Sequence, residues 1–490
     1  MKHNTAKRTT AAILTLLTLI PLLISCASDD GTSAQTAAND TTAANAETTA
    51  AETELVPDLD VDYDGAEVHL LIPNWSLYEH YYIAEEQNGD VLNDAIFDRK
   101  LATEEALNVK IKETMIGDAS KAGINQIHPK IKESVLTGSG DYDLAMTHCI
   151  THLINITTEK LVLDWNSIDN VNFDNPWWNS MMNETMSVNG KLLFAASDYI
   201  IPDPNAILFN KEILEAYGLE SPYDYVYDGK WTWDKLTEMS RKVSKDLNGD
   251  GKYDGSDEYG YFAESTWLAI SVMYACDQFM LKDDGEHMVL DINNEKMVKI
   301  VEMYYDLCLG SPSSLVKKAS QMTDAEKNLF DNGQALFHLC SLNKVKQKRE
   351  LEIDFGILPY AKYDEAQDEY ISNNWAGLMC IPIDAPDPDM TGAVSEYLAY
   401  ESRKKVMPIY YDALLNTKFA RDEESKDMLD IIFSNSAYDI GLCYSNFNRL
   451  LYTLVCTIDE KTRDFASYYA KEEASVQASY DSVFAVYYED

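Results

Sequence analysis

The sequence predicts an α/β protein with mainly parallel sheets, and two observations lead to this prediction. Short apolar runs such as Glu67–Pro73 (EVHLLIP) read as buried strands. Between such runs lie longer segments with apolar residues at helical spacing, for example Ile96–Leu107. Strands that alternate with helices are typical of α/β folds with parallel sheets.

The individual elements follow in chain order. Strands are expected at Glu67–Pro73, from Asn108 onward, and at Asp143–Thr147, Lys191–Ser197, Gln334–Cys340, Asp354–Pro359 and Gly377–Pro382. Helices are expected at Ile96–Leu107, Lys130–Leu136, Asn210–Tyr217, Thr232–Lys245 and Glu295–Leu309. Gly218 ends the third of these helices. The last hundred residues are expected to be mostly helical, and we find no internal repeat.

The composition excludes two classes of partner. The 490 residues contain 40 Lys and Arg against 82 Asp and Glu, a formal net charge of −42. Nucleic acids and anionic lipids both require a basic surface, so neither is an expected partner. The 31 Tyr and 8 Trp suit a core, and they also suit a surface that binds ring-shaped molecules.

The chain begins with a targeting segment, residues 1–26. Basic residues precede an apolar run of 14 residues, Ala11–Ile24. A bilayer-spanning helix needs about 20 residues, so this run fits a secretory signal peptide instead. It ends in Leu-Ile-Ser-Cys26, which resembles a bacterial lipobox, and Cys26 is therefore the expected lipidation site. The alternative is an ordinary signal peptide cut nearby, and either reading places the mature chain outside the cytoplasm.

Residues 27–59 are expected to form a disordered tether. Thr, Ala, Asp and Glu dominate this stretch, and it has no aromatic residue. It cannot bury enough apolar area to offset the entropy of ordering. Such a tether would hold a soluble body away from a membrane.

The cysteines indicate buried thiols and not a disulfide framework. Eight occur in the sequence, and no two form a C-x-x-C pair. Seven remain after Cys26, an odd number that argues against complete pairing. We expect most of them to be small buried hydrophobic residues. They are Cys149, Cys276, Cys308, Cys340, Cys380, Cys443 and Cys456.

Residues that follow the predicted strands are candidates for a binding crevice. Ligands of open α/β sheets bind beyond the carboxyl ends of strands. Each residue alone could equally belong to a surface loop, and the set is more informative than its members. The residues are Asn74, Trp75, Thr147, His148, Asp198, Tyr199, Ser341 and Asn343.

A series of short motifs covers nearly the whole chain. They are Tyr63-Asp-Gly, Gly89-Asp-Val-Leu-Asn-Asp-Ala with Arg99, Tyr142-Asp-Leu, Pro176-Trp-Trp, Asn189-Gly-Lys, Leu208-Phe-Asn-Lys-Glu, Gly229-Lys-Trp-Thr, Phe330-Asp-Asn-Gly-Gln-Ala, Asp354-Phe-Gly-Ile-Leu-Pro and Tyr397-Leu. In this order and spacing, with the lipobox and the tether, the chain resembles the family 1 extracellular solute-binding lipoproteins of bacterial ABC importers, which are related to maltose-binding proteins.

The resemblance implies two doubly wound α/β lobes joined by a multi-crossing hinge, the type II periplasmic-binding-protein architecture. Residues 60–200 and 335–380 would form the N-lobe, and residues 201–334 and 381–490 the C-lobe. The crossings would lie near Asp198–Asn205, Gly333–Leu339 and Gly377–Ile383. The lobes would close on the ligand by hinge motion.

The ligands of this family are usually sugars, oligosaccharides or polyols. Aromatic faces stack on sugar rings, and planar polar groups bind the hydroxyls. The expected ligand-binding residues are Trp75, Thr147, His148, Trp177, Trp178, Asp198, Trp267, Asn343 and Trp375. Trp177 and Trp178 could equally serve packing, and Trp231 and Trp233 are expected in the core.

Residues 246–257 match the calcium loop D-x-[DN]-x-[DN]-G with an acidic residue at position 12. The expected ligands are Asp246, Asn248, Asp250, the Lys252 carbonyl, Asp254 and Asp257. Asp257 is shorter than the usual Glu, and the segment after the loop looks extended. The motif therefore predicts a structural Ca²⁺ site that resembles half an EF-hand, and the alternative is an acidic turn that binds nothing.

The sequence favours a binding protein without catalysis. It contains no G-x-S-x-G, Walker A or G-x-G-x-x-G motif. We expect a monomeric, lipid-anchored, extracellular protein that captures a carbohydrate and delivers it to ABC permease subunits. The alternatives are a secreted carbohydrate-active enzyme and a receptor that presents its ligand to a sensor kinase.

Overall fold

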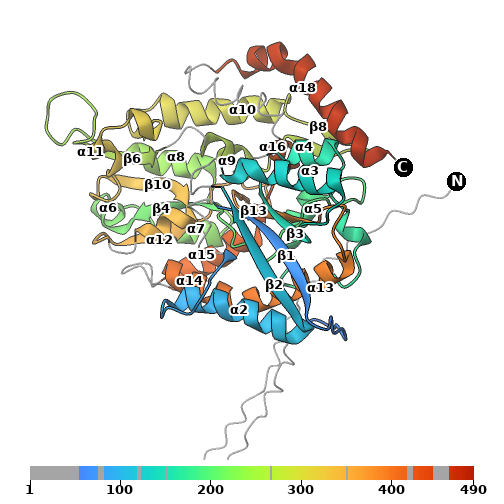
Figure 1. Ribbon diagram of the computed structural model, residues 1–490. Coiled ribbons are helices and arrows are strands. Elements are labelled where there is room, and N and C mark those ends of the chain that lie inside the picture. The colour runs from blue at the N-terminus through green and yellow to red at the C-terminus, as the bar shows by residue number, and fades with distance from the viewer. Residues whose placement is uncertain are drawn as a thin grey trace, which may run out of the picture. The chain divides into compact units, whose positions relative to one another are not determined.

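Two β-sheets with helices around them organise the chain in the unit Val56–Asp490 (Figure 1). The computed structural model describes residues 55–74, 82–117, 123–149, 152–264, 268–348, 351–415, 423–444 and 463–489. The lipobox with Cys26 and most of the tether lie outside these ranges, as do Trp75 and Trp267.

The first sheet has the strand order β13-β3-β1-β2. β1 (Ala66–Pro73) is parallel to β2 (Val109–Ile116) and β3 (Leu144–His148), and β13 (Gly377–Cys380) is antiparallel to β3. Leu70, Leu71 and Ile72 of β1 are completely buried, as the run of apolar residues predicted.

Helices α2 (Val91–Leu107) and α3 (Ile127–Thr137) connect the parallel strands. The Asp90 side chain begins α2 by accepting the amide hydrogens of Leu92 and Asn93. Asn108 ends the same helix in the left-handed conformation, with φ of 50°. In Figure 1 the first sheet lies between these two helices.

The second sheet is mixed, with the order β11-β4-β10-β6-β5 and β9 beside β6. β10 is parallel to β6 but antiparallel to β4, and β11 is also antiparallel to β4. The expectation of mainly parallel sheets is therefore wrong for this half of the chain. The strands are β4 (Asn205–Asn210), β5 (Ser244–Lys245), β6 (Glu258–Ala263), β9 (Ser314–Val316), β10 (Ala335–Ser341) and β11 (Phe355–Leu358).

Shorter elements complete the body. The helices are α4 (Leu153–Thr158), α5 (Ser180–Met186), α6 (Lys211–Ala216), α7 (Pro222–Tyr227), α8 (Trp233–Lys242), α9 (Leu268–Ala275), α10 (Glu295–Tyr304), α11 (Asp324–Lys327) and α12 (Leu342–Gln347). The 3₁₀-helices are η1 (Gly123–Gln126), η2 (Trp165–Ser167) and η4 (Ala319–Gln321), and η3 (Tyr305–Leu309) is a π-helix. The strand pairs are β7 (Leu281–Asp283) with β8 (Met288–Leu290), and β12 (Ser372–Asn373) with β14 (Ser436–Ala437).

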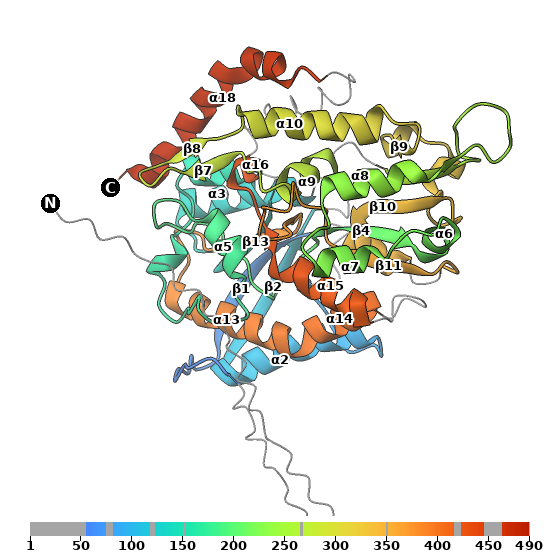
Figure 2. The same ribbon diagram turned by 180° about the vertical axis from the view of Figure 1, so that it is seen from behind.

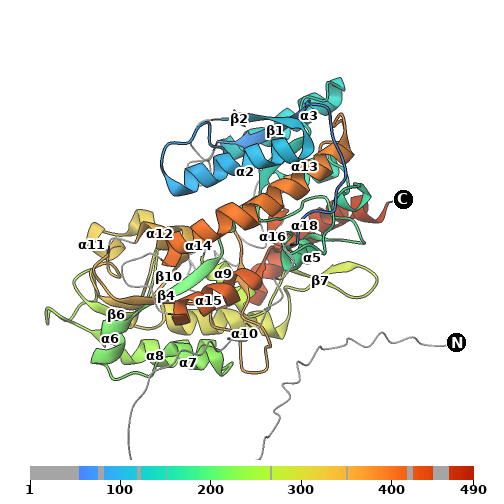
Figure 3. The same ribbon diagram turned by 90° about the horizontal axis from the view of Figure 1, so that it is seen from below.

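The C-terminal part is mostly helical where it is described, as expected. α13 (Pro388–Glu401), the π-helix η5 (Ser402–Val406) and α14 (Met407–Leu415) follow one another without a break. α15 (Glu423–Ser434), α16 (Ile440–Cys443) and α18 (Phe465–Tyr488) follow. Figure 3 shows α13 and α14 running from the first sheet's helix α2 toward the second sheet.

Two expectations about the connection of the sheets need correction. Residues 191–197 do not form a strand, because they make only isolated bridges, such as Ala195 with Met379 of β13. The expected N-lobe segment 335–380 is also divided. β10 and β11 belong to the second sheet because they flank β4, and only β13 joins the first sheet.

The described cysteines confirm the prediction of buried thiols. Six are free and buried: Cys149, Cys276, Cys308, Cys340, Cys380 and Cys443. Trp231 and Trp233 lie in the core, also as predicted. Among the described residues, no helix has both the length and the apolar character required to cross a bilayer.

Candidate functional site

A cluster of buried polar side chains lies where the chain passes between the two sheets. Asp203, just before β4, accepts the amide hydrogen of Asn343 at 2.9 Å, and the Asp203 amide donates to Asn374 Oδ1 at 2.8 Å. Asn205 Nδ2 donates to Ser271 Oγ at 2.8 Å and to Asn373 Oδ1 at 3.0 Å. We call these six residues the polar junction: Asp203, Asn205, Ser271, Asn343, Asn373 and Asn374.

Two side-chain atoms of the polar junction make no hydrogen bond to the described protein. Asn205 and Asn373 are 1% and 2% exposed, and within the described part of the chain Asn205 Oδ1 and Asn373 Nδ2 make no hydrogen bond. A buried polar atom without a partner destabilises a fold by about 1–3 kcal/mol. A buried polar atom without a protein partner is paired with water, an ion or a ligand, or is retained for a function.

Of the described residues expected at strand ends, Asn343 belongs to the polar junction, and Asn74, Thr147, His148, Asp198, Tyr199 and Ser341 do not. Asn343 follows the end of β10, and Asn373 lies in β12, a short strand between β11 and β13. The antiparallel bridge between Pro204 and Asn374 brings the first and last crossing segments together. The junction thus joins residues 203–205, 271, 343 and 373–374.

Thr147 and His148 lie at the end of β3, as predicted, and both are buried. The Thr147 hydroxyl donates to the Leu378 carbonyl at 3.0 Å, a contact between strands of the first sheet. His148 is opposite Gly377 in the same pair of strands. Trp375 is partly buried and packs against the core beside the polar junction.

Trp177 and Trp178 are tied to one carboxylate. Their indole nitrogens donate to Glu396 Oε1 at 2.8 Å and Oε2 at 2.6 Å, and Asn175 Nδ2 donates to Oε1 at 2.5 Å. Glu396 is 2% exposed and belongs to α13. This arrangement is the packing role that the sequence left open as an alternative to ligand binding.

A separate cavity of about 550 Å³ lies near the crossing segments. Trp178 and Asp198 line it, together with Pro176, Asn179, Ser180, Pro202, Arg403, Met407, Pro408, Tyr411, Asp430, Phe433 and Ser434. We call it the hinge pocket, because its residues come from the segment before β4 and from η5, α14 and α15. It shares no residue with the polar junction.

An ion pair connects two walls of the hinge pocket. Arg403 Nη1 lies 2.9 Å from Asp198 Oδ2, and the Asp198 side chain is 13% exposed. Burial raises the pKa of the Asp198 carboxyl to about 6, although Arg403 acts in the opposite direction. The pair therefore fastens η5 to the first crossing segment when Asp198 is ionised.

Sequence reasoning did not name Asp203, Asn205, Ser271, Asn373 or Asn374, five of the six residues of the polar junction. The sequence did contain a signal for Asp203, Asn205, Asn373 and Asn374. The first crossing was expected at Asp198–Asn205, and two consecutive asparagines precede Trp375. Residue type alone does not reveal that these segments meet, since they are separated by about 170 positions.

The predicted calcium loop is closed by its own hydrogen bonds. The Asp246 carboxylate accepts the amide hydrogens of Gly249 and Gly251 at 2.6 and 2.8 Å. The Asp257 carboxylate accepts those of Leu247 and Asp254 at 3.0 and 2.9 Å. Across the described ranges, no three Asp, Glu, His or Cys side chains are grouped to hold a metal ion.

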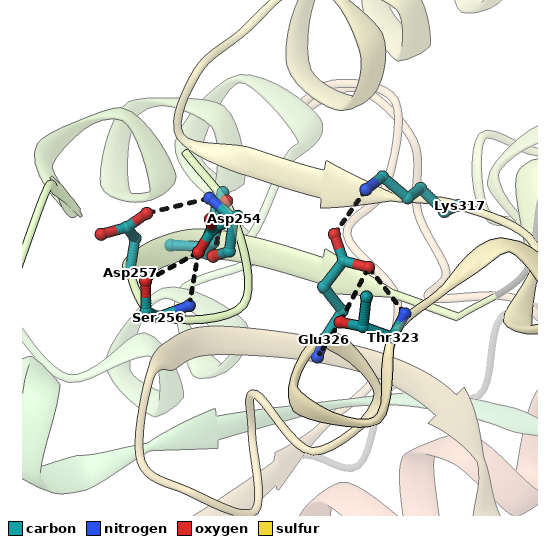
Figure 4. A network of polar contacts seen from close by, with 7 residues as sticks. Asp254, Ser256, Asp257, Lys317, Thr323 and Glu326 are labelled. Carbon is teal, nitrogen blue, oxygen red and sulfur yellow. Dashed lines mark hydrogen bonds and ion pairs between the residues drawn. The ribbon is translucent and has the colours of Figure 1, made fainter. Parts of the chain in front are cut away.

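The loop rests against the short helix α11 (Figure 4). A Cβ atom at Gly255 would lie 2.8 Å from the Ala325 Cβ. α11 begins with a capping box between Thr323 and Glu326, and Lys317 forms an ion pair with Glu326. This packing holds the second half of the loop in place.

Comparisons with known proteins support the architecture. No protein-family model and no curated protein sequence matches this chain. A sugar transporter from Rhizobium etli, in an open conformation, matches with 14% identity and a TM-score of 0.59, over 84% of this chain and 100% of that one.

Two further solved structures match over similar lengths. The cyclic α-maltosyl-1,6-maltose binding protein of Arthrobacter globiformis has 14% identity and a TM-score of 0.54, over 86% of this chain and 99% of that one. An ABC substrate-binding protein of Listeria monocytogenes, in complex with cycloalternan, has 12% identity and a TM-score of 0.51, again over 86% and 99%.

These matches and the two sheets define a class of architecture. The chain has the two-lobed α/β fold of maltose-binding-like periplasmic binding proteins, type II. Each lobe is built around one of the two sheets, and the polar junction lies where the chain crosses between them.

Proposed function

We propose that this protein is a carbohydrate-binding component of an ABC importer and that the polar junction contributes to its binding site. The observation that carries the proposal is the set of buried amide and carboxylate groups at the crossing of the two lobes. The solved structures of the same fold include proteins named for sugars and for ABC transport.

The chemistry of the polar junction suits sugar hydroxyls. A hydroxyl group both donates and accepts, and Asn offers a donor and an acceptor in one plane. Asn205 Oδ1 and Asn373 Nδ2 supply one free acceptor and one free donor in the described structure. Buried groups of this kind discriminate strongly against ligands that leave them unpaired.

Binding would proceed by closure of the two lobes. A ligand that contacts both lobes stabilises the closed state by its differential affinity for that state. The polar junction unites residues of the crossing segments with Asn343 and Ser271 of the second lobe, so a ligand there would sense the relative position of the lobes.

The test is thermal unfolding of the chain from residue 27 onward against a panel of sugars. A sugar at 100 times its Kd should stabilise the native state by about 2.7 kcal/mol and raise the Tm. The sugar should be recovered unchanged after incubation. Consumption of the sugar would support the carbohydrate-active enzyme, and the absence of any shift would contradict the proposed ligand class.

We further propose the cellular arrangement that the N-terminal sequence predicts. Lipid at Cys26 would anchor a monomeric protein to the extracellular face of the bacterial membrane, where it delivers its ligand to two permease subunits. Labelling of growing cells with radioactive palmitate should mark the wild type and not Cys26→Ala. A ligand-presenting receptor would bind the same sugar, but deletion of the protein would then leave sugar uptake unchanged.

Calcium binding by residues 246–257 stays a separate proposal. If the loop binds Ca²⁺, millimolar Ca²⁺ should raise the Tm of the wild type and not that of Asp250→Ala. Asp234→Ala, which removes a carboxylate from α8 outside the loop, is the matched control. An equal response in all three proteins would leave the loop as an acidic turn.

A further inference from the structure

The C-terminal helix α18 (Phe465–Tyr488) contacts elements of both lobes. It packs on α4, which directly follows β3 of the first sheet, and on α10, which lies between β6 and β9 of the second. Figures 1 and 2 show α18 in red along the edge of the molecule that α10 and α3 also occupy.

The C-terminal end of α18 is attached to the first lobe. Asn189 Nδ2 donates to the Tyr487 carbonyl at 2.9 Å, and Lys191 Nζ donates to the Glu489 carbonyl at 3.0 Å. Lys160 Nζ lies 2.6 Å from Glu489 Oε2. Cationic groups at the C-terminus of a helix are favourable because the helix dipole is negative there.

The segment that makes these contacts is fixed to the first sheet. The Leu163 amide donates to the Ile381 carbonyl at 2.9 Å, and Trp165 Nε1 donates to the Met379 carbonyl of β13 at 3.2 Å. The Trp165 amide also donates to the Leu192 carbonyl at 2.8 Å, so the stretches near Lys160 and Lys191 are both attached to the first sheet.

The same helix is attached to the second lobe through the hairpin β7–β8. The Met288 amide donates to the Tyr488 hydroxyl at 2.7 Å, and the Tyr480 hydroxyl donates to the Met288 carbonyl. The His287 and Tyr488 rings lie 4.8 Å apart. The hairpin connects α9 to α10, within the chain segment between two strands of the second sheet.

We propose that α18 is a clasp that joins the two lobes and limits how far they separate. The last two turns of the helix bond to the first lobe and to the β7–β8 hairpin, so wide separation of the lobes would break one set of bonds. Loss of either set should have the same consequence, because a clasp needs both attachments. This property concerns the motion of the lobes and goes beyond the proposed sugar binding.

The experiment measures the distance between the lobes without any sugar. Spin labels are placed at Leu136→Cys on α3 and Tyr227→Cys on α7, residues that are 73% and 52% exposed. The described native cysteines are buried, and Cys456 is replaced by Ser. Double electron–electron resonance spectroscopy then gives the distribution of distances between the two spin labels.

Two variants break one attachment each. Lys160→Gln with Asn189→Gly removes two bonds to the first lobe, and glycine keeps the positive φ of 50° at position 189. Tyr480→Phe with Tyr488→Phe removes the two hydroxyl bonds to the hairpin. Gln477→Ala is the control, because this exposed residue donates to Asp481 within the same helix.

The clasp predicts longer and broader distance distributions in both variants and no change in the control. Circular dichroism and the Tm establish that each variant is folded. If a double variant does not fold, the four single substitutions, which each remove one bond, are measured in its place. Unchanged distributions in folded variants would overturn the proposal. A change in only one of the two variants would also overturn it, since α18 would then act on one lobe alone. Because no sugar is present, this result is independent of the proposed function.

Discussion

At the scale of single residues, the two adjacent tryptophans show what residue type leaves undecided. An indole ring suits a sugar face and a protein core equally well. The deciding partner, Glu396, lies about 220 positions further along the chain and is completely inside the protein. Nothing near Trp177 or Trp178 in the sequence indicates that carboxylate, so only the fold distinguishes the two roles.

Replacing Glu396 by Gln should destabilise the protein by about 3 kcal/mol or more. Two indole donors, the Asn175 side-chain amide and the Asn172 backbone amide bond to this carboxylate, and such bonds contribute about 1.5–3 kcal/mol each. Urea unfolding followed by tryptophan fluorescence measures the change. Glu473→Gln, at an exposed position of α18, is the control. A loss below about 1 kcal/mol for Glu396→Gln would show that the bonds of Trp177, Trp178 and Asn175 to Glu396 contribute little.

Asp198 should make stability depend on pH between about 4 and 6. Its pKa is raised in the folded protein from 3.8 to about 6, with burial as the main cause. The folded state therefore binds the proton more tightly, so the free energy of unfolding falls as pH rises through this window. Two pKa units correspond to about 3 kcal/mol.

The variant Asp198→Asn removes this titration and keeps an oxygen that accepts from Arg403. The difference in unfolding free energy between wild type and variant should change between pH 4 and 6 and stay constant above pH 7. Asp439, whose pKa burial also raises to about 6, is present in both proteins and cancels. A difference that is independent of pH from 4 to 7 would contradict this account.

At the scale of elements, the strands inside the sheets could be predicted from the sequence. The strand boundaries next to the crossings between the lobes could not. The sequence runs that form β1, β10, β11 and β13 are apolar because other parts of the protein cover both faces of each strand. β4 was not predicted, although its residues Ala206–Phe209 are apolar and buried. Residues 191–197 are apolar because they are buried beside β13, and not because they pair along their length.

The contact between α8 and β6 depends on a glycine. A Cβ atom at Gly260 would lie 1.9 Å from the Ser240 carbonyl oxygen, and a backbone atom cannot move aside cheaply. Gly260→Ala should therefore lower the free energy of unfolding by about 3 kcal/mol or more, at the upper end for overpacking. Gly310→Ala, whose nearest atom would be at 3.2 Å, should cost much less. Chemical unfolding of the two variants side by side checks this, and equal losses would contradict the packing argument.

At the scale of the whole molecule, the two-lobed fold could be predicted from the order of many weak motifs. The division of the chain between the lobes could not, because β10 is inserted between β4 and β6 and takes residues 335–341 into the second lobe. Likewise, each residue of the expected crevice was chosen from the end of a single strand. The polar junction depends on four separated segments meeting, which is a property of the complete fold.

The central proposal is that the polar junction contributes to the sugar-binding site, and the alternative site is the hinge pocket. Calorimetric titration of the sugar found by the thermal screen tests it directly, with wild type, Asp203→Asn and Tyr411→Phe. Asp203→Asn keeps an oxygen for the Asn343 amide and removes a carboxyl group from the polar junction. The account predicts at least about tenfold weaker binding for this variant, equivalent to about 1.4 kcal/mol, and Tyr411→Phe within about twofold of wild type. Wild-type affinity in Asp203→Asn together with weakened binding in Tyr411→Phe would contradict the account and place the sugar in the hinge pocket.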